Sequence, residues 1–314
     1  MKRRTLLVGL AGAPAVLSLP VRAQAMLKIA FGFSAVTDFS TVFVATDEGL
    51  FNKRGLDVEP RFIPLNPTII PGIESGSLQM GGPTPPGFLQ AVDGGLDHVV
   101  LAGGGSFSKK YTEIALVARA GTSIRSAADC VGKKIGVPGL GALLHVTFRQ
   151  WLKLAGVDYS KVSFIEAPFP QHGDLIRGGS LDAVVTAGPF LARILEAGTG
   201  YVSSYYTTFL PEGYPTIVHT ARRDWVQKNP AVPKAFREAL VEATAWMAKP
   251  ANDARMREIV AKYLKTPPAI AAKMQIGPPL PVVTVPHLKW WVDMMREQQM
   301  LKGNPALDTL IAKG

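Results

Sequence analysis

The chain has 314 residues, of which 47% are hydrophobic and 18% charged, with a formal net charge of +10. This length allows a large core, in one large or two medium domains. The basic residues are spread along the chain without an aromatic-interleaved cluster, which argues against nucleic-acid binding and leaves a mild field that favours anions.

The first 25 residues have the three parts of a cleaved secretory signal. Residues 1–4 are basic, residues 5–19 are apolar and uncharged, and Ala23-Gln24-Ala25 fits a signal-peptidase site. The alternative is a transmembrane anchor, but this run is shorter than the roughly 20 apolar residues that cross a bilayer. We therefore expect an exported protein starting near Met26, with Sec and twin-arginine export both open because of Arg3-Arg4.

After this segment, short apolar runs alternate with helical patterns. The pattern predicts strands over 27–31, 58–63 and 98–102, and helices over 39–53, 69–75 and 85–94. A second series predicts strands over 114–118, 134–137, 162–165 and 183–186, with helices over 142–155, 171–177 and 190–196. One more strand is expected over 216–220, followed by helices over 235–248, 254–263 and 286–299.

Two alternating series of strands and helices predict two α/β lobes, each with a mostly parallel sheet covered on both faces. We expect the first lobe over 26–116 and the second over 117–215. The segment 216–314 is expected to return to the first lobe and to add the C-terminal helices. The chain is expected to cross between lobes near residues 117–119 and 215–217.

Residues 138–141, Pro-Gly-Leu-Gly, join a predicted strand to a predicted helix. The first N–H groups of a helix are unpaired and glycines let a ligand approach, so the amides of 139–142 are predicted to hold a carboxylate or sulfonate. A tight structural turn is the alternative. The loop is not a nucleotide loop, because Leu144 replaces the third glycine of the dinucleotide-binding pattern and Lys134 the Ser or Thr of a P-loop.

Catalytic and metal-binding patterns are weak, and no cofactor is expected. Cys130 is the only cysteine and is expected to be a buried small hydrophobe. The five histidines are too far apart for metal-ligand spacing. His145 and His172 follow strand-end loops and either reach the cleft or are ordinary histidines, while Arg149 is expected to be solvated.

Other candidates lie in loops after strands. Asp38 offers a carboxylate to the cleft or serves as the N-cap of the next helix. Phe33, Phe169 and Phe190 are expected to form an apolar pocket together, with core positions as the alternative.

Four motifs resemble the nitrate/sulfonate/taurine/thiamine-precursor family of periplasmic solute-binding proteins. They are Val-Ala-Thr-Asp-Glu-Gly-Leu-Phe at 44–51 with Arg-Gly-Leu-Asp-Val-Glu at 54–59, Glu-Ser-Gly-Ser-Leu-Gln-Met-Gly at 74–81, Gly-Lys-Lys-Ile-Gly-Val-Pro-Gly at 132–139, and Gly-Gly-Ser-Leu-Asp-Ala at 178–183. Departures from the family pattern are Gln79 for Asp, Cys130 for Leu, and Pro83-Thr84-Pro85-Pro86 for small hydroxyl residues.

The resemblance implies a monomeric two-lobe clamp of the second structural type, which captures a small solute in the periplasm and delivers it to an ABC permease in the inner membrane. It implies that the ligand loops are 33–38, 83–85, 139–142, 169–170 and 188–190. A thiamine-pyrimidine synthase has the same fold, but its cysteine-rich motif is missing here. A binding protein that reports to a membrane sensor stays open. The candidate ligand-binding residues in and beside the loops are Phe33, Ser34, Thr37, Asp38, Thr84, Pro85, Gly139, Leu140, Gly141, Ala142, His145, Phe169, Gly188 and Phe190.

Overall fold

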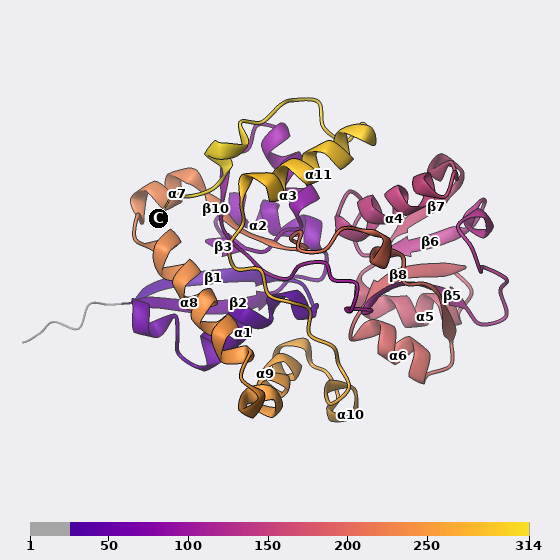
Figure 1. Ribbon diagram of the computed structural model, residues 1–314, viewed down its shortest axis with the longest axis horizontal. Coiled ribbons are helices and arrows are strands. Elements are labelled where there is room, and N and C mark those ends of the chain that lie inside the picture. The colour runs from indigo at the N-terminus through magenta and orange to yellow at the C-terminus, as the bar shows by residue number, and fades with distance from the viewer. Residues whose placement is uncertain (1–25, 314) are drawn as a thin grey trace, which may run out of the picture.

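The computed structural model of the chain describes residues 26–313 and contains two five-stranded sheets, each covered by helices (Figure 1). The strand order is β2-β1-β3-β10-β4 in the first sheet and β7-β6-β8-β5-β9 in the second. The predicted α/β class is therefore confirmed. The expected signal segment, residues 1–25, lies outside the described residues.

The first sheet is built on β1 (Leu27–Phe33), whose last five residues are all buried. Such a continuous apolar run is typical of a strand covered on both faces. It pairs in parallel with β2 (Leu56–Phe62) and β3 (Met80–Gly81), and the antiparallel β10 (Val218–Arg222) joins β3 to β4 (His98–Gly103). The helices between these strands are α1 (Ser40–Asp47), α2 (Ile69–Glu74) and α3 (Pro85–Asp93).

The second sheet contains β5 (Ile114–Arg119), β6 (Lys134–Val137), β7 (Ser163–Glu166), β8 (Ala183–Ala187) and β9 (Gly200–Ser204). β6 pairs in parallel with β7 and β8, whereas β5 is antiparallel to both of its neighbours. In Figure 1, α4 (Leu143–Leu154) covers one face, and α5 (His172–Arg177) and α6 (Phe190–Glu196) cover the other.

The C-terminal part returns to the first sheet as helices. These are α7 (Arg223–Lys228), α8 (Val232–Met247), α9 (Asp253–Leu264), α10 (Pro268–Ala271) and α11 (Val285–Glu297). α8 packs on α1 and β4, and α11 packs on α3 (Figure 1). These C-terminal helices therefore pack against elements of the first sheet.

The first crossing between the sheets lies earlier than predicted. β5 pairs with β8 from Ile114 to Ala118, so a lobe boundary at 116/117 and a crossing at 117–119 would cut a strand of the second sheet. Residues 117–119 continue β5 and are not a connection between the lobes. The crossing segments are instead residues 104–113 and 205–217. They lie side by side, because Ser106 bridges Pro215 and the N–H of Phe107 donates to the Tyr214 carbonyl (3.0 Å).

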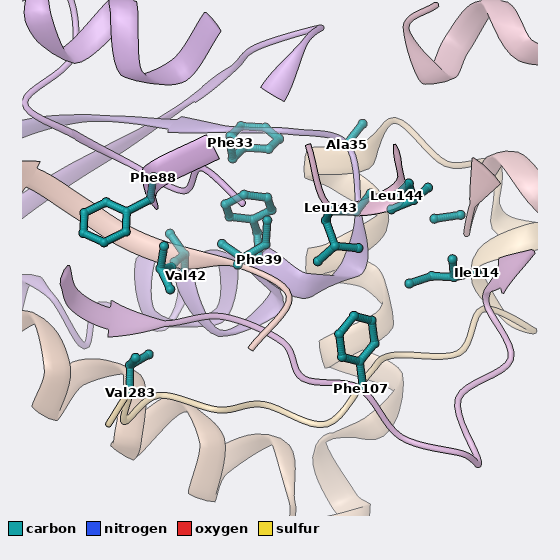
Figure 2. Packing of buried hydrophobic residues seen from close by; sticks show 14 of the residues in the cluster. Phe33, Ala35, Phe39, Val42, Phe88, Phe107, Ile114, Leu143, Leu144 and Val283 are labelled. Carbon is teal, nitrogen blue, oxygen red and sulfur yellow. The ribbon is translucent and has the colours of Figure 1, made fainter. Parts of the chain in front are cut away.

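Buried apolar side chains from both lobes form one cluster (Figure 2). Figure 2 shows Phe39 and Ala35 from the first lobe near Leu143 and Leu144 from the second. The two lobes therefore share an apolar contact.

Two buried histidines on neighbouring strands differ in their hydrogen bonds. His219 on β10 is fully buried against Phe31 and Phe236, and neither ring nitrogen has a hydrogen-bond partner among the described residues. His98 on β4 is also fully buried, but its Nε2 lies 2.7 Å from Glu74 Oε1. A buried polar group without a hydrogen bond lowers the stability of the fold. We therefore expect the His219 ring to destabilise the folded state and the hydrogen-bonded His98 ring to stabilise it.

We expect His219→Leu to raise the free energy of unfolding by about 1 kcal/mol, and His98→Leu to lower it by a similar amount. Burial lowers the pKa of His219 to about 3. Below an unfolded pKa near 6.5 the unfolded chain binds a proton that the folded chain cannot, so stability falls as the pH falls toward 3. The advantage of His219→Leu should therefore grow between pH 7 and pH 4 in urea titrations. Equal losses in both variants would contradict the distinction.

Candidate ligand-binding site

A cavity of about 40 Å³ lies between the two lobes. Its polar lining comes from the first lobe and the second crossing, and we call these five residues the polar arc: Ser34, Asp38, Asn66, Thr84 and Thr216. The facing wall is apolar and comes mainly from the second lobe. Its residues are Val36, Pro64, Ile114, Pro138, Ala142, Leu143, Leu144, Phe169, Ala187 and Ile217.

Asn66 organises the polar arc. Its Nδ2 donates to Ser34 Oγ (3.1 Å) and to the Gly82 carbonyl (3.0 Å), and its Oδ1 accepts from the Thr84 N–H (2.9 Å). Because the Ser34 oxygen accepts a hydrogen bond from Asn66, the Ser34 hydroxyl proton is left for the cavity. Sequence reasoning missed Asn66, although the residue lies just after β2, at the same strand ends as the predicted loops.

Two helix N-termini from opposite lobes point their positive ends toward this cavity. Thr84 is the N-cap of α3 and its Oγ1 accepts from the Gly87 N–H (3.4 Å). Pro85 and Pro86 have no N–H, so the start of α3 offers a field but no free amide at these positions. Ala142 is the N-cap of α4, whose first helical bond runs from the Val146 N–H to the Ala142 carbonyl (3.0 Å).

The first turn of α4 therefore keeps unpaired amides, and its residues Leu143 and Leu144 line the cavity. Hydroxyl protons on one side and helix amides on the other are all hydrogen-bond donors. Such a set suits a ligand with negatively charged oxygen atoms.

The predicted anion site on the amides of 139–142 is wrong for most of that loop. The Leu140 N–H donates to Glu166 Oε2 (2.8 Å), and the Gly141 N–H donates to His145 Nδ1 (2.9 Å). The Ala142 N–H bonds back to the Gly139 carbonyl (3.2 Å). These N–H groups are hydrogen-bonded within the second lobe. The unpaired amides are therefore those of the first turn of α4.

His145 supports this loop and does not line the cavity. Burial lowers the pKa of His145 to about 4, so its ring is neutral near pH 7, as its acceptor role toward Gly141 requires. The ring also packs edge-on against Phe164, with 4.6 Å between ring centroids.

Gly139 and Gln90 lie where the two lobes are in contact beside the cavity. A Cβ on Gly139 would lie 2.7 Å from Pro67 Cδ in the first lobe. Gln90 on α3 donates from its Nε2 to the Gly141 carbonyl (2.9 Å). A second hollow of about 290 Å³, which shares Asn66 and Ala142 with the cavity, lies next to this contact.

The three phenylalanines do not come together as predicted. Phe169 lines the cavity and stacks on Phe190, with 5.5 Å between centroids. Phe33 packs instead against Phe43 (4.9 Å) and Tyr263 in the first lobe. The end of β1 turns this ring away from the cleft and into the core.

The remaining predicted residues lie behind the cavity lining. Thr37 Oγ1 is 2.6 Å from the Tyr111 hydroxyl and is buried. Pro85 is buried at the start of α3. Gly188 lies against the Glu113 carboxyl, where a side chain would have no room.

Asp38 is half-buried and lines the cavity, and no side-chain cap hydrogen bond is found at the start of either neighbouring helical segment. The predicted N-cap alternative for Asp38 is therefore wrong. Its Oδ1 accepts a hydrogen bond from Thr216 Oγ1. Burial raises the pKa of the Asp38 carboxyl, and the bond from Thr216 offsets part of that rise.

The other chemical candidates are structural. Cys130 is fully buried as predicted, and burial raises its pKa to about 12, so it is a poor nucleophile. His172 is buried with Nε2 2.9 Å from the Ala167 carbonyl, and the Arg149 guanidinium lies over the Tyr159 ring. Residues 26–313 contain no cluster of His, Cys, Asp or Glu that could hold a metal. None of their helices has the length and hydropathy of a membrane span.

Comparison with known proteins gives relatives that are named for nitrate binding and for nitrate import. The chain is 27% identical over 274 residues to the nitrate/nitrite binding protein NrtA of Synechococcus elongatus, covering 76% of this chain and 59% of NrtA. It is 25% identical over 263 residues to the nitrate import ATP-binding protein NrtC of Synechocystis, covering 77% of this chain and 37% of NrtC. The chain thus spans less than two thirds of the length of either relative.

The fold is shared with a solved structure. The periplasmic aliphatic sulphonate binding protein SsuA of Escherichia coli superposes with a TM-score of 0.72 at 18% identity, over 91% of this chain and 97% of SsuA. This match confirms the expected two-lobe binding-protein fold. The model of the family described as NMT1-like matches residues 23–261, and the chain therefore belongs to the NMT1-like family.

Proposed function

We propose that the chain is the solute-binding component of an ABC importer and captures a small organic anion in the cavity between its lobes. The observation that carries this proposal is the set of donors around the cavity. The Ser34 hydroxyl and the first amides of α4 approach it from opposite lobes, and two helix N-termini add positive potential. The apolar wall around Phe169 suits the organic part of the ligand.

The relatives support the same role. NrtA is named for binding nitrate and nitrite, NrtC for nitrate import, and SsuA for binding aliphatic sulphonates in the periplasm. We propose by analogy that this chain works in the periplasm as a monomer, after removal of residues 1–25. It would then deliver its ligand to a permease in the inner membrane, driven by an ATPase.

We propose that the lobes close on the ligand by a hinge at the crossing segments 104–113 and 205–217. The strands of one sheet lie outside this interval, and those of the other lie between the two segments. Several hydrogen bonds join the lobes in the structure, among them Gln90 to Gly141 (2.9 Å) and Gln298 to Val146 (3.0 Å). Opening would break these bonds and expose the cavity.

The proposal is tested by thermal unfolding of the mature protein with sulfonates, aliphatic and aromatic carboxylates, nitrate and pyrimidines. A ligand at about 100 times its Kd adds roughly 2.7 kcal/mol to the free energy of unfolding, which gives a clear rise in Tm. We expect one anionic class to raise Tm, and the ligand to be recovered unchanged, as a binding protein requires. Stabilisation by cations alone would contradict the proposed anion, and turnover of the ligand would favour an enzyme.

A further inference from the structure

Asp38 presents a carboxyl to a cavity that is otherwise lined by neutral polar groups and apolar groups. None of the residues that line this cavity is Lys, Arg or His. An ionised Asp38 would repel an anion held only a few ångströms away, in a space of about 40 Å³. The carboxyl therefore conflicts with an anionic ligand unless its charge is removed.

The surroundings of Asp38 do not supply a compensating charge. Among residues 26–313, the hydrogen bonds to this carboxyl come from the neutral Thr216 hydroxyl and from the backbone of Asp38 itself. The backbone covers the carboxyl closely, since a Cβ on Gly105 would lie 2.5 Å from Asp38 Oδ1. No Lys or Arg among residues 26–313 contributes to the pKa of Asp38, which burial raises.

The titratable groups that face Asp38 from neighbouring elements are uncharged or acidic. On the first crossing, Tyr111 has a pKa well above its ordinary value because it is buried, and Glu113 beyond it has a raised pKa for the same reason. On β10, the His219 ring packs against Phe39, and burial lowers its pKa to about 3. None of these groups stabilises an ionised Asp38 near neutral pH.

We propose that Asp38 accompanies the bound anion as a neutral carboxylic acid that donates a hydrogen bond to it, so that the protein takes up one proton with each anion. This inference rests on the proposed capture of an anion. In this state the acid proton of Asp38 joins the other donors proposed to hold the anion, which are the hydroxyl of Ser34 and the first amides of α4. The cavity then favours monovalent anions, because no Lys, Arg or His lines it to balance a second negative charge.

Proton uptake makes affinity depend on pH in a defined way. Above the pKa of Asp38 in the free protein, the fraction of molecules with a protonated Asp38 falls about tenfold for each pH unit. The Kd should therefore rise about tenfold per unit. Below that pKa the affinity should be constant. Methanesulfonate and nitrate stay ionised at all of these pH values. Any change of Kd with pH therefore comes from a titrating group of the protein and not from the anion.

The test is isothermal titration of methanesulfonate, with nitrate as a second probe, between pH 5 and pH 8.5. At pH 8, buffers of different ionisation enthalpy should show uptake of about one proton per anion in the native protein. Asp38→Asn, which keeps a donor and the acceptor for Thr216, should bind with an affinity that does not vary with pH and without proton uptake. Thr216→Val removes the bond that favours the ionised carboxyl, so its affinity should begin to fall only at a higher pH.

Asp308→Asn is the matched control, because Asp308 is exposed and does not line the cavity, and it should behave as the native protein. Binding of methanesulfonate by the native protein without pH dependence would overturn the role of Asp38 while leaving anion capture intact. Loss of binding in an Asp38→Asn protein that still unfolds cooperatively would overturn it as well. If neither anion binds at pH 5, and propylamine binds more tightly as the pH rises, then Asp38 is a counter-ion and the anion proposal itself fails.

Discussion

Gly139→Leu is expected to weaken ligand binding at least 100-fold while leaving the lobes folded. Gly139 lies where the second lobe meets Pro67 of the first, and a Cβ there would be 2.7 Å from Pro67 Cδ. A leucine therefore separates the lobes and disfavours the closed state. If it holds the closed population to about 1%, the apparent affinity falls about 100-fold. Titration calorimetry with the most stabilising anion of the panel measures this loss.

The stability of the Gly139→Leu protein should stay within about 0.5 kcal/mol of the native value, because the side chain points between lobes and not into a core. Gly173→Ala is a suitable control: it lies in α5, and its Cβ would meet only Ile194 Cγ1, at 3.6 Å. Small-angle scattering should show a larger radius of gyration for Gly139→Leu with ligand present. Native affinity in this variant would mean that the lobes do not approach each other at Gly139 when ligand is bound.

Asn66→Asp is expected to abolish anion binding, with a loss of 100-fold or more. The carboxylate can still accept from the Thr84 N–H, but it cannot donate to Ser34 Oγ or to the Gly82 carbonyl. The Ser34 hydroxyl would turn its proton toward the new carboxylate and away from the cavity. A second acidic group would also face the ligand. The variant therefore loses both the Ser34 hydroxyl as a donor and the positive potential at the cavity.

The free energy of unfolding of Asn66→Asp should fall by about 1–3 kcal/mol, because the Gly82 carbonyl loses its donor. Asn304→Asp is the matched control, since Asn304 is exposed and its Oδ1 accepts from Arg296 (2.7 Å), a role that a carboxylate retains. Chemical unfolding separates the stability loss from the affinity loss. If Asn66→Asp bound the anion with an affinity within tenfold of the native value, the polar arc would be excluded as the place where the charged group of the ligand binds.

Much of the fold follows from local pattern. The strand predicted over 183–186 is β8 (Ala183–Ala187), and the helix predicted over 254–263 is α9 (Asp253–Leu264). β8 was predictable because its residues form a short, mostly apolar run that is buried throughout, and α9 because its apolar residues repeat with helical spacing. β9 (Gly200–Ser204) was missed, because its residues are only partly buried and carry serines and a glycine in place of an apolar run.

The candidate site was predictable as a set of loops but not as a set of contacts. Ends of strands converge in α/β lobes, so reading the loops after them found five cavity residues, Ser34, Asp38, Thr84, Ala142 and Phe169. It could not find Asn66, Thr216 or the first turn of α4 as lining groups. Their roles depend on neighbours that are distant in sequence, such as Thr216 beside Asp38.

The sequence by itself determined the α/β class, the two series of strands and helices, and several of the loops that line the cavity, because these depend on residue pattern and turn chemistry within short segments. Only the tertiary structure decided which donors are free. Glu166 and His145 occupy the amides of Leu140 and Gly141, and Asn66 leaves the Ser34 proton to the cavity. A hydrogen bond goes to whichever partner the fold brings within about 3 Å, and that proximity is not encoded in local spacing.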